Sequence, residues 1–330
     1  MNNKRPLVSI AIPTYNEEEY LGRCLKSIAM QKMIGEIEVL VVDDDSTDRT
    51  IEIAKSFQDR LNVRILRNGN KDAEKGKKIG LAASTGEFFM YLDADMEYAD
   101  RDWFNVSTKP LLQDKKIIGT LASFGVSKEQ NAITRCISYD IFQRDPIFIA
   151  FTPSVKRTII EKKEGYYLCE FSPEVIPGQS LCLYRADVLK KLFKDEPFLM
   201  DNDVPVKLVK KGHRYFAFCP QVKIYHFLLK NLRELFKKRM RGVLKTYMAH
   251  LSNREYKWIN LQKKSNVLLL GLWVVYANLF ILATIYGIYK SLKHRDYACL
   301  YEPLITIVST DALIWGFLKS KGKIGDLFKI

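Results

Sequence analysis

Short apolar runs alternate with amphipathic stretches through the first hundred residues of the chain. The runs are rich in β-branched residues, and each has the length of one strand buried in a parallel sheet. They cover residues 7–12, 37–42, 63–66 and 88–92, and the stretches between them predict helices from about residue 17, over 48–57 behind a cap at Ser46 or Thr47, and around 77–83. This alternation predicts a parallel α/β sheet, whose ligands bind at the carboxyl ends of the strands.

The pattern becomes irregular between about residues 109 and 176, and it predicts no order of elements there. Helical periodicity returns near Asn231, where apolar residues recur every three or four positions and lysine or arginine fills most of the others. This arrangement is typical of a basic amphipathic helix. Its cationic face could be solvated or could bind phosphate, but contact with anionic lipid is the interpretation we favour.

Two apolar runs follow the basic helix. Residues 267–289 carry no formal charge over 23 positions, enough to cross a hydrocarbon core of about 30 Å. We therefore predict a transmembrane helix, with a buried core helix as the alternative. The second run, about residues 298–318, is a weaker candidate because it contains Glu302, Pro303 and Asp311. The flanking cations favour a hairpin of two spans over a single span, although the second segment could be interfacial.

Composition changes this picture chiefly by locating the charge. The 330 residues carry 52 Lys+Arg against 38 Asp+Glu, a net charge of +14. Residues 205–264 hold 16 of these cations and only two acidic residues, so the rest of the chain is neutral in sum. A basic block directly before an apolar run favours a membrane surface as its partner and argues against nucleic acid.

The cysteines and the start of the chain bear on its compartment. The six cysteines have no metal-binding spacing, and no secretory signal opens the sequence. We therefore expect a reduced, cytoplasm-facing protein at the cell membrane. The organisation we predict is a catalytic domain over 1–230, a basic interfacial helix and linker over 231–264, and a membrane region with one or two transmembrane helices over 265–330.

Carboxylates follow the predicted strands. Asp93 and Asp95 come just after one strand and point to the same side, an arrangement that suits Mg²⁺ or Mn²⁺ completed by phosphate oxygens. Such a triplet alone is weak evidence, but residues 43–45 and 13–17 end two other strands in the same way. Helix capping would explain one or two of the aspartates. Neither GxGxxG after the first strand nor GxxxxGK[ST] occurs, so a metal and side chains must meet any phosphate charge.

Four motifs in order carry a family resemblance. They are VSIAIPTYNEE from Val8, VVDDDSTD from Val41, Gly76-Lys77, and Gly86-Glu87 leading into Asp93-Ala94-Asp95. Over about residues 7–97 the chain resembles glycosyltransferase family 2, the inverting GT-A transferases. Asp45, in place of the commoner glycine, is similar to the dolichyl-phosphate mannose synthase branch. The resemblance implies a GT-A Rossmann-like, mostly parallel sheet flanked by helices, here followed by the basic helix and the hairpin.

The same resemblance implies site residues and a cofactor, Mg²⁺ or Mn²⁺. The nucleotide would be bound by Pro13, Tyr15, Asn16, Glu17, Asp43, Asp44, Ser46, Lys77 and Asp93. The metal would be bound by Asp93 and Asp95, with Glu97 and His226 as further ligands. The acceptor or its phosphate would contact Gly178, Gln179, Asp203, Arg239 and Arg241. Two of these residues have other interpretations, because Tyr15 could be a strand-end core aromatic and His226 a buried core histidine.

The resemblance places the general base at Asp201, although Met200 stands where the family has a glutamate. Asp201 could also be the N-cap of a helix over 204–211, and the two roles can coexist. A sugar hydroxyl must lose a proton as it attacks, whereas a lipid phosphate is already ionised, so a retained base favours a hydroxyl acceptor. The adjacent basic helix favours a lipid phosphate, and the sequence leaves both open.

The sequence thus predicts a membrane-anchored, metal-dependent inverting glycosyltransferase. It would move a sugar from a nucleoside-diphosphate sugar to a lipid-linked or polyprenyl-phosphate acceptor, in an oligomeric state that the sequence does not specify. The alternative is a non-catalytic membrane module that binds nucleotide sugar or anionic lipid, which only Met200 favours. The QxxRW motif of processive synthases is absent, which argues against polymer extrusion.

Overall fold

A computed structural model describes residues 7–33, 36–178, 181–247, 254–256, 258–259 and 262–320. The chain divides into two compact units. Unit 1 comprises residues 1–125 and 155–226, and unit 2 comprises residues 126–154 and 227–330. The first part of unit 2 is therefore an excursion that leaves unit 1 after Gly125 and returns to it at Val155.

Unit 1 is built on one mixed sheet. Its strands are β1 (Val8–Thr14), β2 (Ile37–Asp43), β3 (Asn62–Arg67), β4 (Phe88–Tyr91), β5 (Met96–Tyr98), β6 (Ile117–Phe124), β7 (Ile159–Lys163), β8 (Tyr166–Glu170), β9 (Cys182–Arg185) and β10 (Tyr215–His226). Among the described residues their order is β3-β2-β1-β4-β9-β6-β10-β8-β7, with β5 paired to β10. The pairs β1–β2, β2–β3, β1–β4 and β6–β10 are parallel, and β9 runs antiparallel to β4 and β6.

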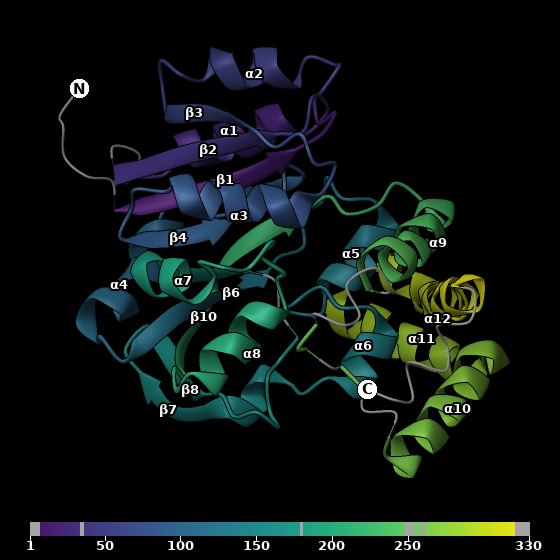
Figure 1. The fold of residues 1–330 in the computed structure, drawn as a ribbon. Coiled ribbons are helices and arrows are strands. Elements are labelled where there is room, and N and C mark those ends of the chain that lie inside the picture. The colour runs from purple at the N-terminus through teal and green to yellow at the C-terminus, as the bar shows by residue number, and fades with distance from the viewer. Residues whose placement is uncertain are drawn as a thin grey trace. The chain divides into compact units, whose positions relative to one another are not determined.

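Helices flank this sheet. They are α1 (Leu21–Ala29), α2 (Thr50–Ser56), α3 (Ala73–Ala83), α4 (Trp103–Gln113), the 3-10 helix η2 (Val155–Thr158), α7 (Ala186–Leu192) and α8 (Asp203–Lys210). Helix α3 lies across β1 (Figure 1), and the approach depends on Gly80, where a Cβ atom would overlap that of Ala11. The core is the cluster of buried apolar side chains from the central strands together with those of α1 and α4. The predicted mostly parallel α/β sheet is confirmed.

The predicted elements of the first hundred residues match the structure within a few residues. One detail is wrong, because Ser46 and Thr47 do not cap the second helix. That helix begins at Thr50, whose backbone N–H donates to Asp48. Ser46 instead uses its hydroxyl to close the loop after β2, where it donates to Asp43.

Unit 2 is helical. Its elements are α5 (Ala132–Ser138), α6 (Pro146–Phe151), α9 (Leu232–Arg241), the π-helical turn η3 (Gly242–Tyr247), α10 (Lys264–Leu279), α11 (Ile281–His294), the 3-10 helix η5 (Tyr297–Tyr301) and α12 (Glu302–Lys319). Within the unit, α12 packs beside α9 and α11 (Figure 1). The basic amphipathic sequence near Asn231 forms α9, which Asn231 caps through the backbone N–H of Glu234.

The first apolar run does not form the continuous helix that the sequence predicts. It breaks at Phe280, a non-glycine residue with φ of 64°, and α10 and α11 meet there at a bend of 74°. Among the described residues, one helical segment, Tyr297–Lys319, is long and apolar enough to cross a membrane, and the bent pair would be a second if it is counted as one span. Just over half of the most apolar part of Tyr297–Lys319 is buried inside the protein.

Candidate functional site

Two carboxylates and an imidazole gather at the carboxyl edge of the sheet. Asp93 and Asp95 follow β4, and His226 ends β10. Each of the three side chains offers a ligand atom within 4.8 Å of the other two, and Nε2 of His226 lies 3.1 Å from Oδ1 of Asp95. Ligands of one small divalent ion lie within about 4 Å of each other, so a shift of about 1 Å would bring all three onto one ion.

Strand pairing explains how His226 reaches this edge. β5 begins directly after Asp95 and pairs antiparallel with β10, with Met96 opposite His226. The imidazole is buried and stacks on Phe124, at a centroid distance of 5.8 Å. Glu97 lies on the same short strand, but its carboxylate pairs with Arg23 of α1, and it is not among the three clustered side chains.

The loop after β2 is held by Asp43. This buried carboxylate accepts hydrogen bonds from the hydroxyls of Thr14 and Ser46, at 2.9 Å and 2.6 Å, and from the backbone N–H of Ser46. Asn16, with φ of 56°, joins the loops after β1 and β2, because its backbone N–H donates to Ser46 and its side chain accepts from Thr47. The two strand ends are therefore locked together.

The remaining residues predicted to bind nucleotide lie at the same edge. Pro13 is partly buried in β1, the backbone N–H of Glu17 donates to Thr50, and the Tyr15 side chain is 54% exposed. That exposure excludes the interpretation of Tyr15 as a core aromatic. The buried Asp44 accepts from the backbone N–H of Lys71, at 2.8 Å, in the loop before α3.

Lys77 of α3 lies between two carboxylates. Its buried ammonium donates to Asp201, lies 3.3 Å from Glu74, and stands 4.8 Å from the ring centre of Tyr91. Burial alone would lower the pKa of Lys77, but Asp201 and Glu74 outweigh burial and raise it. Burial raises the pKa of Glu74 to about 8, against the opposing effect of Lys77. The residue predicted to lie near the nucleotide therefore contacts the predicted general base.

Asp201 lies in the turn before α8. The helix begins at Asp203, and its N-cap residue is Asn202, one position later than the alternative interpretation of Asp201 requires. Asp203, predicted to contact the acceptor, is buried in the first turn of α8. Gly178 is buried as well, and Gln179 lies outside the described residues.

The two arginines predicted to contact phosphate lie on α9 in unit 2. The guanidinium of Arg239 donates to both oxygens of Asp145, a carboxylate with no exposed surface. Arg241 is exposed. Arg239 is thus already committed to an ion pair within its own unit.

Two contacts of the site were not anticipated from the sequence. Glu74 stands one helical turn before Lys77, and this i,i+3 spacing could have signalled the pair. The exposed Asp45, with φ of 60°, accepts two hydrogen bonds from Arg67 at the end of β3. Because β3 is the parallel neighbour of β2, the residue that ends β3, Arg67, could have been expected to lie near Asp45.

The mixed sheet with its flanking helices has the GT-A-type fold, and the cluster of Asp93, Asp95 and His226 lies at its strand ends. A solved structure, the mannosyltransferase PcManGT from Pyrobaculum calidifontis in complex with GDP-Man and Mn²⁺, has the same fold at 16% sequence identity, with a TM-score of 0.56 over 95% of this chain and 88% of that one. Residues 9–193 match the family model described as Glycosyl transferase family 2, and the chain belongs to that family.

Two curated relatives differ in how much of this chain they match. The dolichyl N-acetyl-alpha-D-glucosaminyl phosphate 3-beta-D-2,3-diacetamido-2,3-dideoxy-beta-D-glucuronosyltransferase of Methanococcus voltae is 24% identical over 98% of this chain and 99% of its own length. The poly(ribitol-phosphate) beta-N-acetylglucosaminyltransferase TarS of Staphylococcus aureus is 35% identical over 97 residues, which are 28% of this chain and 17% of TarS.

Proposed function

We propose that this family 2 glycosyltransferase is a metal-dependent, inverting enzyme at the cytoplasmic face of the cell membrane. It would move a sugar from a nucleoside-diphosphate sugar to a lipid-linked or polyprenyl-phosphate acceptor. The observation that carries the proposal is the cluster of Asp93, Asp95 and His226 at the carboxyl edge of the sheet. Parallel α/β sheets bind their ligands at that edge.

The cluster suits a divalent cation by the chemistry of its side chains. Two carboxylates and one imidazole match Mn²⁺ or Mg²⁺, with the remaining positions left for water and diphosphate oxygens. The bound ion would stabilise negative charge on the leaving diphosphate. We assign its ligands to Asp93, Asp95 and His226, and we leave out Glu97 because its carboxylate is paired with Arg23.

The locked ends of β1 and β2 would bind the nucleoside. Tyr15 is exposed and available to stack on a base, while Glu17 and Asp44 would accept hydrogen bonds from sugar hydroxyls. Asp43 already accepts three hydrogen bonds from Thr14 and Ser46. We therefore assign a structural role to Asp43 and Ser46, which hold the loop after β2. Asn16 has a similar role, because it connects the ends of β1 and β2.

The acceptor side would use Asp201. Its carboxylate would take the proton from an attacking hydroxyl, and Lys77 would hold that carboxylate ionised and oriented before the acceptor arrives. A lipid phosphate would need no such proton transfer. The Methanococcus relative, which matches nearly the whole chain, is named for a dolichyl phosphate-linked sugar, and this supports a lipid-linked sugar with a free hydroxyl as the acceptor class.

A direct assay tests the proposal. Purified protein and lipid extract would be incubated with Mn²⁺ and a panel of labelled nucleoside-diphosphate sugars, and the organic phase would then be counted. We expect label in the lipid from one donor, and a loss of at least about a hundredfold in the Asp95→Asn variant.

The matched control is Asp187→Asn, an exposed aspartate of α7 away from the strand-end cluster, which should transfer as the wild type does. Undiminished transfer by Asp95→Asn would refute the metal-dependent mechanism. Binding of a nucleotide sugar without any transfer or hydrolysis would instead support the non-catalytic module.

A further inference from the structure

Helices α10 and α11 of unit 2 expose a large number of apolar side chains. Within Ile281–Lys290 only Ala283, Gly287 and Lys290 are buried, and the other side chains face outward. Lys290 turns its charge inward, where its ammonium lies 2.6 Å from Glu302 of α12. The exposed apolar side chains of the two helices are Val267, Leu268, Leu269, Leu272, Val275, Leu279, Phe280, Ile281, Leu282, Ile285, Tyr286, Ile288, Tyr289 and Leu292. A patch of this extent requires a partner.

The bend at Phe280 makes each helix too short to cross a bilayer. α10 has 16 residues and α11 has 14, or about 24 Å and about 21 Å at 1.5 Å per residue, against a hydrocarbon core of about 30 Å. The residues on either side of the bend, Leu279 and Ile281, are 59% and 67% exposed. The bend between the two helices is therefore apolar and exposed.

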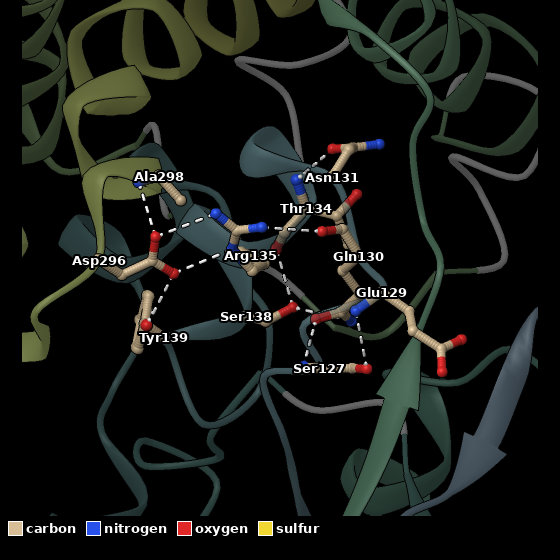
Figure 2. Close-up of polar contacts among 10 residues, drawn as sticks. All are labelled: Ser127, Glu129, Gln130, Asn131, Thr134, Arg135, Ser138, Tyr139, Asp296 and Ala298. Carbon is tan, nitrogen blue, oxygen red and sulfur yellow. Dashed lines mark hydrogen bonds and ion pairs between the residues drawn. The ribbon is translucent and has the colours of Figure 1, made fainter.

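Both ends of the bent pair are tied to residues 126–154. Before α10, the ring of Trp258 packs against Phe148 of α6 at a centroid distance of 5.0 Å. After α11, Asp296 accepts from the guanidinium of Arg135 on α5, at 2.9 Å and 3.1 Å, and from the hydroxyl of Tyr139 (Figure 2). Arg135 also donates to the carbonyl of Gln130, in the turn that precedes α5.

Residues 126–154 must lie on the side of the membrane where unit 1 lies. They leave unit 1 at Gly125 and rejoin it at Val155, and the structure describes all of them. Their helices α5 and α6 have seven and six residues, far fewer than the roughly 20 that a span needs. The bent pair is therefore anchored on one side of the membrane at its start and on the same side at its end.

Helix α12 packs against α5, α9 and η3 of the same unit. Ile305 shares a buried cluster with Leu235 of α9 and Ile133 of α5, and a Cβ atom on Gly316 would lie 2.8 Å from Val243 of η3. α9 thus accompanies α12 along much of its length while carrying the cations Lys237, Lys238 and Arg241. Moving those cations into hydrocarbon would cost about 2.5–3.5 kcal/mol each. Helix α12 is accordingly the core helix of unit 2.

We propose that α10 and α11 dip into one leaflet of an anionic bilayer and return to the same side, so that the chain is anchored without crossing the membrane. This inference rests on the membrane association proposed above. The exposed cations Lys263, Lys264, Lys293 and Arg295 lie at the two helix ends remote from the apolar bend, where anionic headgroups would meet them.

Vesicle flotation tests the contact surface. The purified full chain should float with vesicles of neutral and anionic phospholipid, and the double variant Leu282→Glu/Ile285→Glu should lower the bound fraction at least about tenfold. The matched control is Leu112→Glu/Ile160→Glu, which changes two equally exposed apolar side chains of unit 1 and should float as the wild type does. Equal flotation of both double variants would refute α10–α11 as the lipid contact.

Cysteine labelling in sealed membrane vesicles tests the topology. The six native cysteines are buried, so single cysteines can be introduced at Lys293 near the end of α11 and, as the reference for unit 1, at exposed Lys55 on α2. An impermeant maleimide should label Lys293→Cys and Lys55→Cys from the same side. Labelling from opposite sides would establish that the bent pair crosses the bilayer and would overturn the inference.

Failure of this inference is distinguishable from failure of the proposed function. A wild-type chain that does not float, and that forms a lipid-free dimer by sedimentation, would show that a second copy covers the apolar surface. That result would remove both the one-leaflet anchor and the membrane association. Sugar transfer to a detergent-solubilised acceptor would be unaffected by either outcome, because it is measured without a bilayer.

Discussion

The ammonium of Lys77 donates to the carboxylate of Asp201, across 124 positions of sequence. This bond joins α3, which packs against β1 and β2, to the turn that precedes α8. Because the Lys77 side chain is 4% exposed and that of Asp201 is 26% exposed, the cation is the buried member of the pair. Both ends of the bond belong to unit 1.

The Asp201→Asn variant distinguishes the two acceptor classes. If the acceptor is a hydroxyl, loss of the base should lower the rate of transfer by about 10²–10⁴-fold while donor binding persists. If the acceptor is a lipid phosphate, the rate should hardly change. Single-turnover transfer measures the rate, and donor titration on the same preparation measures the donor affinity. A parallel loss of donor affinity would contradict the assignment of Asp201 to the acceptor side.

Removal of the Lys77 charge should destabilise unit 1. In Lys77→Met, Glu74 and Asp201 face each other without the intervening cation, and we expect a loss of about 3 kcal/mol at neutral pH. Lys77→Arg keeps the positive charge and should therefore recover part of the lost stability. Because the pKa of Glu74 is raised to about 8, its carboxylate ionises between pH 7 and pH 9, where the variant has no cation to stabilise it, so the deficit of Lys77→Met should grow over that interval. Denaturant unfolding at both pH values measures this, and a deficit independent of pH would point to lost packing alone.

The proposed metal ligands can be tested apart from catalysis. Mn²⁺ binding, followed by the electron paramagnetic resonance signal of the free ion, should weaken at least about tenfold in Asp95→Asn and His226→Ala. Glu97→Gln is the matched control, because the Glu97 carboxylate is already paired with Arg23. An equal loss of affinity in Glu97→Gln would show that this residue is a ligand after all.

Gly80 should tolerate no side chain. In Gly80→Ala the new methyl group would overlap the Cβ atom of Ala11, so α3 must move away from β1 at a cost of about 1–3 kcal/mol. Gly22→Ala on α1 is the control, since its nearest neighbour would be Ile53 at 3.7 Å. Thermal unfolding compares them, and a Gly80→Ala chain as stable as Gly22→Ala would contradict the close packing of α3.

Glu38 should make the fold sensitive to acid. Burial alone would raise its pKa, but hydrogen bonds from Ser9 and Thr85 outweigh burial and lower it below the ordinary value of 4.5. The folded state therefore binds the proton less tightly than the unfolded state, so this stabilisation is present above about pH 4.5 and is lost as the pH falls through the lowered pKa.

In Glu38→Gln we expect a loss of about 1–3 kcal/mol at pH 7 and a smaller difference from the wild type below pH 4. Unfolding curves across pH 3–7 measure it. The hypothesis fails if the two proteins differ equally at every pH.

The first half of the sheet was predictable because its strands are continuous apolar runs and its strand ends carry the polar motifs. The approach of His226 to Asp95 was foreshadowed only by family resemblance, since it depends on the pairing of β5 with β10. The Lys77–Asp201 contact lies beyond local patterns, because the irregular stretch 109–176 separates the two residues. The break at Phe280 had no sequence signal, as neither glycine nor proline stands at 279–281.

The excursion of residues 126–154 from unit 1 has a consequence for biosynthesis. α5 and α6 leave the ribosome well before α9 and α12. Their apolar side chains therefore stay exposed until the later helices cover them. The early residues are Ile133, Ile137 and Ile147, and the late ones are Leu235, Ile305 and Leu313. A chain that stopped at His226 would complete the sheet yet leave these side chains open to aggregation. Unit 1 therefore cannot be separated from unit 2 by a single cut of the chain.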